Sequence, residues 1–433
     1  MEVLTWIANN IFGVPAFLLG IIVLMGLMLQ KKTVSQTVSG VFKAMIGFLI
    51  INAGAGIITG ALNIFQPLWA EVFGLKAADL GEFMGQTAFN VKFGSAVTLA
   101  MFLGFLINVL LARFTRFKYI YLTGHMMFWT TTIFAGIIVE AVGAENVSNV
   151  KLIAFLAIFM GLYWTFQPAL VQPFMRKVTG GNTIALGHTS AIVAILAALL
   201  GKIFGNKAND TEKIKLPKGL EFLRDSNVIT ALTMGVLFFV GAVIISFKGS
   251  VGSEELIAQA AGQNFPMYSI IQSFTFAGGI AVVLLGVKMF ISEIVPAFNG
   301  IAKKIVPGAI PALDAPVVFT FAPNAVIIGF LGAFAGALIW LVVLGNTVAY
   351  VFVPTMIVLF FHGATAGVFG NSTGGVRGAL IGGFVTATIV AWGQYIMVHL
   401  LNATTIPDTA MWAADSDMFV LGPIVKALAH LFF

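Results

Sequence analysis

The sequence contains no cysteine in 433 residues, and only 9% of its residues are Asp, Glu, Lys or Arg, whereas 59% are hydrophobic. Without cysteine the chain has no disulfides, no cysteine nucleophile and no thiolate metal site, so any thiol chemistry belongs to a partner. With so little charge and a mean hydropathy of +1.01, its apolar surface exceeds what a soluble domain can bury. The composition therefore indicates an integral membrane protein.

The motifs of several enzyme classes are also missing. There is no GxxxxGK[ST] phosphate loop, no GxSxG nucleophile elbow and no HExxH zinc motif, so we expect no catalytic residues, no cofactor and no metal site. The net charge of +6 comes from basic residues in short segments between apolar runs. Such basic loops are typical of membrane proteins, in which they set the orientation of the helices, and do not indicate nucleic-acid binding.

Long apolar runs predict an all-α polytopic membrane protein with about ten to twelve transmembrane helices. A helix of about 20 apolar residues crosses the roughly 30 Å of hydrocarbon in a bilayer. Runs of this kind include residues 16–29, 95–111, 228–246 and 324–345.

The charged residues predict the orientation of these helices. Basic clusters lie at Lys31–Lys32, Arg113–Lys118, Arg176–Lys177, 202–224 and Lys303–Lys304. Acidic residues gather in the alternate segments 67–90, 140–148 and 249–265. By the positive-inside rule the basic segments are cytoplasmic and the N-terminus is outside the cell.

The polar segment 205–226 falls just before the middle of the chain. We interpret it as a cytoplasmic connector between two pseudo-repeats, 1–204 and 227–433, within a single membrane domain. An alternative is that it forms part of a docking surface for a soluble protein. The two halves show little direct similarity, but each offers a polar residue near the end of a span followed by a broken apolar segment.

Those broken segments are 179–196 and 359–383, where Gly, Asn, Ser, Thr and His interrupt short apolar pieces. Irregular backbone at membrane depth survives only where protein or a watery cavity satisfies its polar groups. We therefore expect re-entrant hairpins there, and a binding site between them.

Ionisable residues at membrane depth cost about 2.5–3.5 kcal/mol each on insertion scales, so each calls for an explanation. His188 lies in a polar "GHTS" tip, and Asp314 is the only acid between Glu293 and Asp408. Both offer hydrogen bonds suited to a hydroxylated ligand, as does His125. The structural alternatives are an interfacial role for His125 and a helix cap before Pro316 for Asp314.

Several blocks of the sequence resemble the ascorbate-type IIC membrane subunit of the bacterial sugar phosphotransferase system. They follow the order of that family from about residue 15 to about residue 400, and they include "KTVSQTVSGVFKAMIGFLIINAGAGIITGAL" (32–62), "YLTGHMMF" (121–128), "GHTS" (187–190), "KLPKGLEFLRDSNVITAL" (215–232) and "PAFNGIAKKIVPGAIPALDAPVVFTFAPNAVIIGF" (296–330).

The resemblance implies a homodimer in the bacterial inner membrane, in which each protomer has an elevator-type core domain and a scaffold domain. It further implies that a separate IIB subunit, carrying a phosphocysteine charged by a IIA subunit, phosphorylates the substrate as it is released.

The resemblance also implies that His125, His188 and Asp314 bind the substrate. Further residues expected to bind it from their own positions are Thr130, Thr189, Asn324, Gly56 and Asn371. The ascorbate-type proteins carry glutamines shortly after each of the two histidines, whereas Trp129–Thr130 and Thr189–Ser190 stand here. L-Ascorbate is the favoured substrate, and another polyol, pentose or sugar acid is the alternative. A proton-coupled secondary transporter, and a membrane enzyme or receptor, are the remaining alternatives.

Overall fold

The computed structural model describes residues 14–74, 86–214, 225–348, 356–400 and 415–433, together with Trp6, Phe222, Tyr350 and Phe352. Eight helices in this part of the chain are long and apolar enough to cross a membrane, and two shorter apolar helices accompany them. The all-α polytopic prediction is therefore confirmed. Part of the predicted connector, residues 215–221 and 223–224, lies outside the described residues.

The helices and strands follow one another with short connections. Their bounds are α2 (Pro15–Leu29), α3 (Val34–Phe73), α4 (Gln86–Phe114), β1 (Tyr119–Tyr121), α5 (Gly124–Val142), α6 (Asn149–Thr179), β2 (Ala185–Leu186), α7 (Ala191–Phe204), the 3-10 helix η2 (Thr211–Lys213), α8 (Ser226–Lys248), α9 (Val251–Ala258), α10 (Phe265–Lys304), β3 (Ile310–Leu313), α11 (Ala315–Phe319), α12 (Pro323–Thr347), α13 (Met356–Leu400) and α15 (Ser416–Phe432).

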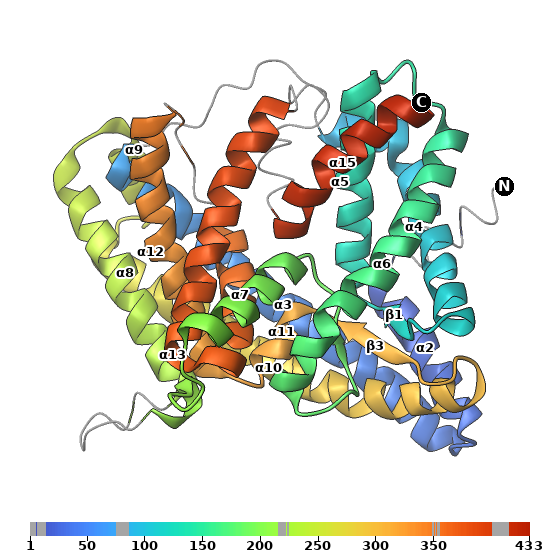
Figure 1. The fold of residues 1–433 in the computed structure, drawn as a ribbon. Coiled ribbons are helices and arrows are strands. Elements are labelled where there is room, and N and C mark those ends of the chain that lie inside the picture. The colour runs from blue at the N-terminus through green and yellow to red at the C-terminus, as the bar shows by residue number, and fades with distance from the viewer. Residues whose placement is uncertain are drawn as a thin grey trace.

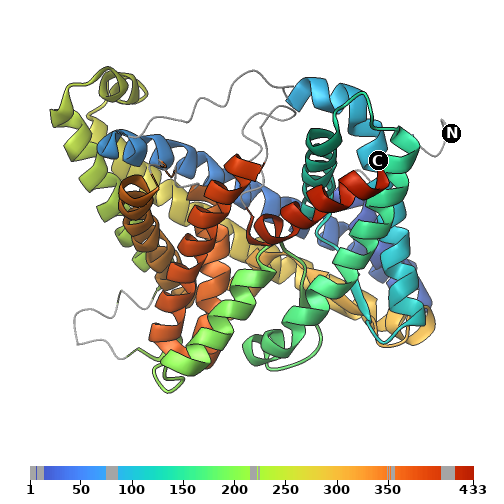
Figure 2. The same ribbon diagram turned by 45° about the horizontal axis from the view of Figure 1, so that its top comes forward.

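Two groups of helices rest on a long pair. The pair is α3 and α10, which lie side by side along the molecule (Figures 1 and 2). One group contains α7, α12 and α13, and the other contains α4, α5 and α6, with α15 between the groups. The small sheet lies where the second group meets α10 (Figure 1).

Glycine contacts hold the first group together. A Cβ atom placed on Gly329 of α12 would lie 2.3 Å from the carbonyl oxygen of Gly363 in α13, and one on Gly383 would lie 2.1 Å from the carbonyl oxygen of Gly329. Such backbone approach is typical of membrane helices, where small residues replace the hydrophobic driving force for association. Because the two backbones touch, there is no room for a side chain between α12 and α13 at these glycines.

The second broken segment of the sequence is a helical hairpin within α13. Gly375 has a φ of 60° and separates the arms 356–374 and 376–400. At 1.5 Å per residue these arms are roughly 28 and 37 Å long. Each arm is therefore about as long as the hydrocarbon layer is thick. The interruption predicted at 359–383 is the turn of this helical hairpin.

The first broken segment instead forms a strand, a turn and a helix. Residues 182–186 pass from the end of α6 into β2, and the chain turns at 188–190 into the 14-residue helix α7. The predicted hairpin at 179–196 therefore has one extended arm and one helical arm.

The three strands form a parallel sheet in the order β1-β3-β2. Tyr121 and Ala185 both pair with Ala312 on the central strand. The strands are two to four residues long and nearly all buried, as expected of a parallel sheet covered on both faces. Because they are parallel, their carboxyl ends meet at one edge of the sheet.

The packing of α12 against α13 yields a prediction. Gly329→Ala inserts a methyl group between touching backbones, so it should destabilise the protein by about 1–3 kcal/mol and lower the melting temperature measured by tryptophan fluorescence. Gly345→Ala is the matched control, because a Cβ atom at this exposed position of the same helix meets nothing within 4 Å. Equal melting temperatures for the two variants would contradict this account of the packing.

Candidate functional site

The carboxyl ends of the three strands carry the polar residues that the sequence analysis singled out. Asp314 directly follows β3, His188 comes two residues after β2, and His125 lies in the first turn of α5, just after β1. The hydroxyl of Thr123 donates a 2.6 Å hydrogen bond to the carbonyl of Gly187 and so joins the ends of β1 and β2. Residues more than 180 positions apart thus meet at one edge of the sheet.

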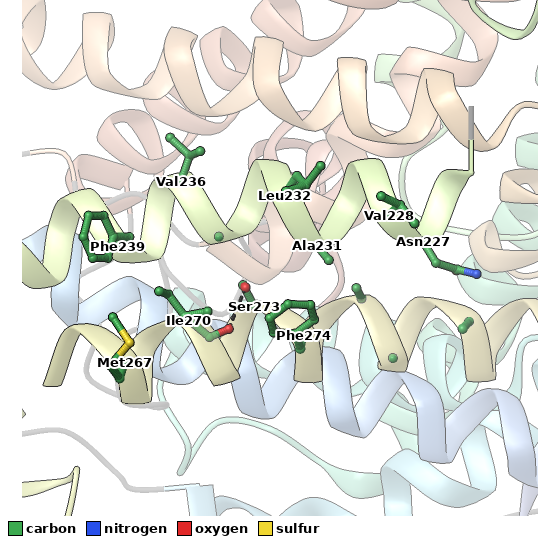
Figure 3. A pocket seen from close by; sticks show the side chains of 14 residues that line it. Asn227, Val228, Ala231, Leu232, Val236, Phe239, Met267, Ile270, Ser273 and Phe274 are labelled. Carbon is green, nitrogen blue, oxygen red and sulfur yellow. Dashed lines mark hydrogen bonds between the residues drawn. The ribbon is translucent and has the colours of Figure 1, made fainter. Parts of the chain in front are cut away.

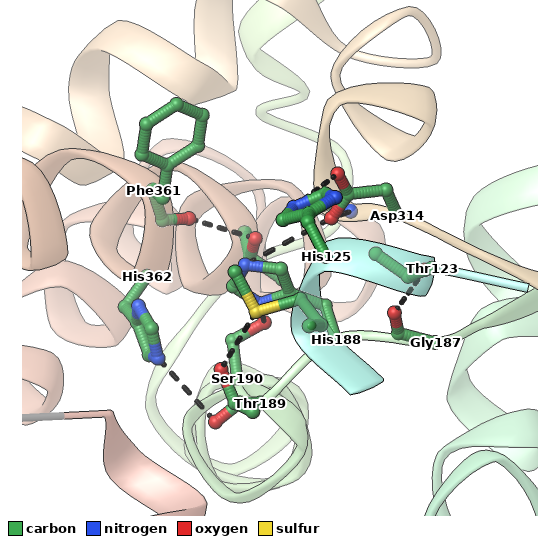
Figure 4. Close-up of polar contacts among 12 residues, drawn as sticks. Thr123, His125, Gly187, His188, Thr189, Ser190, Asp314, Phe361 and His362 are labelled. Carbon is green, nitrogen blue, oxygen red and sulfur yellow. Dashed lines mark hydrogen bonds and ion pairs between the residues drawn. The ribbon is translucent and has the colours of Figure 1, made fainter. Parts of the chain in front are cut away.

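Asp314 lies between the two histidines (Figure 4). Its Oδ2 atom is 3.3 Å from Nε2 of His125, and its Oδ1 atom is 3.9 Å from Nε2 of His188. The backbone N–H of Ala315 donates a 2.8 Å hydrogen bond to Oδ1, which makes Asp314 the N-cap of α11. The predicted capping role is therefore present in addition to the contact with the histidines.

The site becomes more buried from one end to the other. The side chain of His125 is 40% exposed, that of Asp314 is 15% exposed, and that of His188 is 4% exposed. The 3.9 Å separation between His188 and Asp314 is too long for a hydrogen bond. A carboxylate has about four acceptor positions, so Asp314 retains capacity to accept hydroxyl donors from a ligand.

Buried side-chain amides satisfy the outer edges of the sheet. The side chain of Asn108 on α4 donates to the carbonyl of Tyr119 and accepts from the N–H of Tyr121. On the opposite edge, Gln172 and Gln167 of α6 donate to the carbonyls of Ile184 and His188. These amides replace the missing neighbouring strands, since unpaired backbone groups are costly at membrane depth.

A second imidazole and carboxylate pair lies beside the first. Nε2 of His362 on α13 is 3.6 Å from Oδ1 of Asp415, and the rings of His362 and His188 are 5.2 Å apart. The hydroxyl of Thr189 donates a 2.6 Å hydrogen bond to Oδ2 of Asp415.

Among the described residues, no group of three or more His, Asp or Glu side chains has an arrangement that would hold a metal ion.

No pattern in the sequence indicated a role for Asp415, Asp417, Tyr163 or the buried amides. Asp417 accepts a 2.9 Å hydrogen bond from the hydroxyl of Tyr163. The only signal for these two acids is their place directly before the apolar run that forms α15. The amides lie inside long apolar helices, where a single Asn or Gln gives no indication of its partner.

Two of the predicted binding residues lie outside this cluster. Thr130 is buried, but its hydroxyl donates to the carbonyls of Met126 and Met127 in its own helix. Gly56 lies on an open side of α3, where a Cβ atom would meet nothing within 4 Å. Their proposed contact with substrate stays a prediction.

Asn324 and Asn371 lie together in a different place, against the segment that follows α7. Asn371 accepts a hydrogen bond from the N–H of Thr211 and donates one to Asp210. Glu212 accepts hydrogen bonds from the N–H groups of Asn324 and Ala325 at the start of α12. Burial raises the pKa of the Glu212 carboxyl, while these hydrogen bonds and one from Thr211 act in the opposite direction. We call residues 205–213 the strap, since they join α7, α12 and the turn of α13.

A large apolar groove of about 830 Å³ lies between α8 and α10 (Figure 3). Its lining includes Leu232, Val236, Ile270 and Phe274, with Asn227 and Ser273 as its polar members. The hydroxyl of Ser273 donates to the carbonyl of Ile270 in its own helix. None of the described residues that line the groove is titratable, so it has fewer groups for a hydroxylated ligand than the edge of the sheet.

Comparisons with known proteins show the family to which the chain belongs. The chain matches the model of the EIIC-GAT family, described as the PTS system sugar-specific permease component, over residues 10–417. It is also similar to the ascorbate-specific PTS system EIIC component of Mycoplasma pneumoniae, with 27% identity over 451 residues, covering 92% of this chain and 68% of that relative.

The edge of β1 yields a prediction. Asn108→Ala leaves the carbonyl of Tyr119 and the N–H of Tyr121 without partners, and each unpaired buried group costs about 1–3 kcal/mol. We expect a lower melting temperature than for Asn346→Ala, which removes an exposed amide that bonds only its own helix. If both variants melt like the unmodified protein, Asn108 does not support the sheet.

Proposed function

Because this chain belongs to the EIIC-GAT family of sugar-specific permease components of the phosphotransferase system, we propose that it binds a small hydroxylated substrate at the carboxyl edge of its three-stranded sheet and carries it across the membrane. The substrate is held by Asp314, His188 and His125. The other predicted contacts, Thr130, Thr189, Asn324, Gly56 and Asn371, remain predictions.

The observation that carries this proposal is the arrangement of Asp314 between two imidazoles. A carboxylate accepts hydrogen bonds from two neighbouring hydroxyls of a sugar or polyol, and an imidazole both donates and accepts. The site therefore offers acceptors and donors within a few ångströms of each other. His125 at the exposed end provides the point of entry.

L-Ascorbate is the favoured substrate. The relative that is named as ascorbate-specific supports this choice, although it is distant. A pentose, a pentitol or another sugar acid fits the same donor and acceptor groups, and these are the alternatives within the family.

Energy for uptake comes from separate IIA and IIB subunits. The phosphoryl group passes from a cysteine sulfur of IIB to a hydroxyl oxygen of the substrate, so a P–S bond breaks, a P–O bond forms and the hydroxyl proton is released. This chain has no cysteine, so the phosphorylated thiol belongs to the partner. Phosphorylation removes the free substrate from the equilibrium and makes uptake irreversible.

Transport proceeds by an elevator-like movement of a core within a homodimer. The close packing of α7, α12 and α13, joined by the strap, supports their movement as one unit.

The N-terminus is outside the bacterial inner membrane, and the strap is on the cytoplasmic side. A single cysteine introduced at Lys207 of the strap should react with an impermeant reagent only in inside-out vesicles.

A proton-coupled transporter is the second candidate, and the two imidazole and carboxylate pairs favour it, because each pair can hold a proton. Proteoliposomes containing only this chain distinguish the two functions. The phosphotransferase proposal predicts no concentrative uptake of L-ascorbate under a proton gradient, and uptake only with IIA, IIB and phosphoenolpyruvate. Gradient-driven uptake abolished by an uncoupler would establish the second function instead.

The binding site itself yields a prediction. Asp314→Asn keeps the size of the side chain but removes its charge, so the affinity for labelled L-ascorbate should fall by at least about tenfold. Glu293→Gln is the matched control. Glu293 lies on α10, where its carboxylate is 4.0 Å from Lys43 of α3, and it is not part of the proposed site.

Competition by pentoses, pentitols and sugar acids in the same assay identifies the preferred substrate. If a competitor binds more tightly than L-ascorbate and its binding falls in the Asp314→Asn variant, only the ascorbate assignment is wrong. Unchanged binding in that variant would overturn the proposed site.

A further inference from the structure

Three consecutive residues at the start of α15 form hydrogen bonds with the turn that contains His188. We call Asp415, Ser416 and Asp417 the acidic clamp, and residues 188–192 the His188 turn. The hydroxyl of Ser416 and the N–H of Asp417 donate to the carbonyl of Thr189 at 3.0 and 3.1 Å. Asp415 accepts from the Thr189 hydroxyl at 2.6 Å, and Asp417 accepts from the N–H of Ile192 at 2.9 Å.

Side chains from two further helices hold the clamp in place. Tyr163 on α6 donates a 2.9 Å hydrogen bond to Oδ2 of Asp417. His362 on α13 lies 3.6 Å from Asp415, and its Nε2 atom is 3.3 Å from the carbonyl of Thr189. The turn is therefore fixed by groups on three helices, of which α15 contributes the most contacts.

The carboxylate of Asp417 compensates for an unpaired backbone group. The first N–H groups of a helix lack partners and carry a partial positive charge. Asp417 accepts from one of these groups at the start of α7. Among the described residues, the charged partner of Asp415 is His362 rather than a lysine or arginine. The charge of the clamp is thus matched mainly by helix ends and imidazoles.

The polar groups of Thr189 already have partners within the protein. Its hydroxyl lies 2.6 Å from Oδ2 of Asp415 and 3.7 Å from the sulfur of Met126, and its carbonyl accepts from the donors of the clamp and lies near His362. Its neighbour His188 turns its Nε2 atom toward Asp314 and its Nδ1 atom to the hydroxyl of Ser190 at 2.9 Å. His188 is thus directed to Asp314, while its neighbour Thr189 contacts His362 (Figure 4).

We propose that the acidic clamp is a positioning element for the substrate site: by holding Thr189 and Ile192, it fixes where His188 meets the substrate. Thr189 then acts as a positioning residue through the hydrogen bonds that its hydroxyl and carbonyl make with the clamp. This inference rests on the proposed function only in taking His188 as a substrate-binding residue, because the hold of the clamp on the turn requires no ligand.

Hydrogen exchange of the purified full-length protein in detergent tests the hold of the clamp without any ligand. Thr189→Val removes the hydroxyl at nearly constant volume, and Asp417→Ala removes the acceptor of the Ile192 N–H. We expect both to speed exchange of the amides at 188–192 by about fivefold or more, as for the loss of a buried hydrogen bond. Thr189→Ser keeps the hydroxyl and should exchange like the unmodified protein.

Thr386→Val is the matched control, because this buried hydroxyl bonds only the carbonyl of Gly382 in its own helix. If Thr189→Val fails to fold, Tyr163→Phe still tests the clamp, since it removes only the outer hydrogen bond to Asp417. Exchange at 188–192 that is unchanged in every folded clamp variant would overturn the proposal.

Binding of labelled L-ascorbate then separates positioning from structural support. The clamp predicts that Thr189→Val weakens binding while the melting temperature stays close to that of Thr386→Val, and that Thr189→Ser restores affinity. Faster exchange with unchanged affinity would overturn the role of the clamp in the substrate site. If the unmodified protein does not bind L-ascorbate, the substrate assignment fails, and the exchange experiment alone decides whether the clamp holds the turn.

Discussion

The pairing of three short parallel strands inside a membrane protein is the constraint on which the site depends. Backbone N–H and C=O groups at membrane depth must find partners within the protein. The central strand β3 pairs on both sides, and buried amides from α4 and α6 take the place of further strands at the outer edges. Because the strands are parallel, satisfying their backbone also brings Asp314, His125 and His188 to one edge.

Two kinds of contact give the helices around this sheet different roles. Glycine contacts between α12 and α13 bring their backbones together, and the hydrogen bonds of the strap join both helices to α7. This set of contacts favours a stiff unit. The His188 turn, in contrast, is held by hydrogen bonds from α15, from Gln167 of α6 and from α13. The proposed substrate site therefore lies where several groups of helices meet.

The sequence predicted the membrane class, the interrupted segments and the three residues that meet at the sheet, because charge and broken backbone stand out in an apolar chain. It did not predict the strands, since two to four residues are too few to show a period of two. The acidic clamp was missed because its partner Thr189 lies 226 positions away, and no local pattern reports such a contact. Asn324 and Asn371 are predicted substrate contacts because of their place beside broken helices, and this stays a prediction. The sequence did not indicate their hydrogen bonds to Asp210, Thr211 and Glu212, which are distant along the chain.

The central claim is that the substrate binds where the three strands end, and an electron cryomicroscopy structure of the protein in lipid nanodiscs with saturating L-ascorbate tests it most directly. The account predicts ligand density in contact with Asp314, His188 and His125, with the acidic clamp still closed on Thr189. Ligand density elsewhere, for example in the apolar groove between α8 and α10, would contradict it.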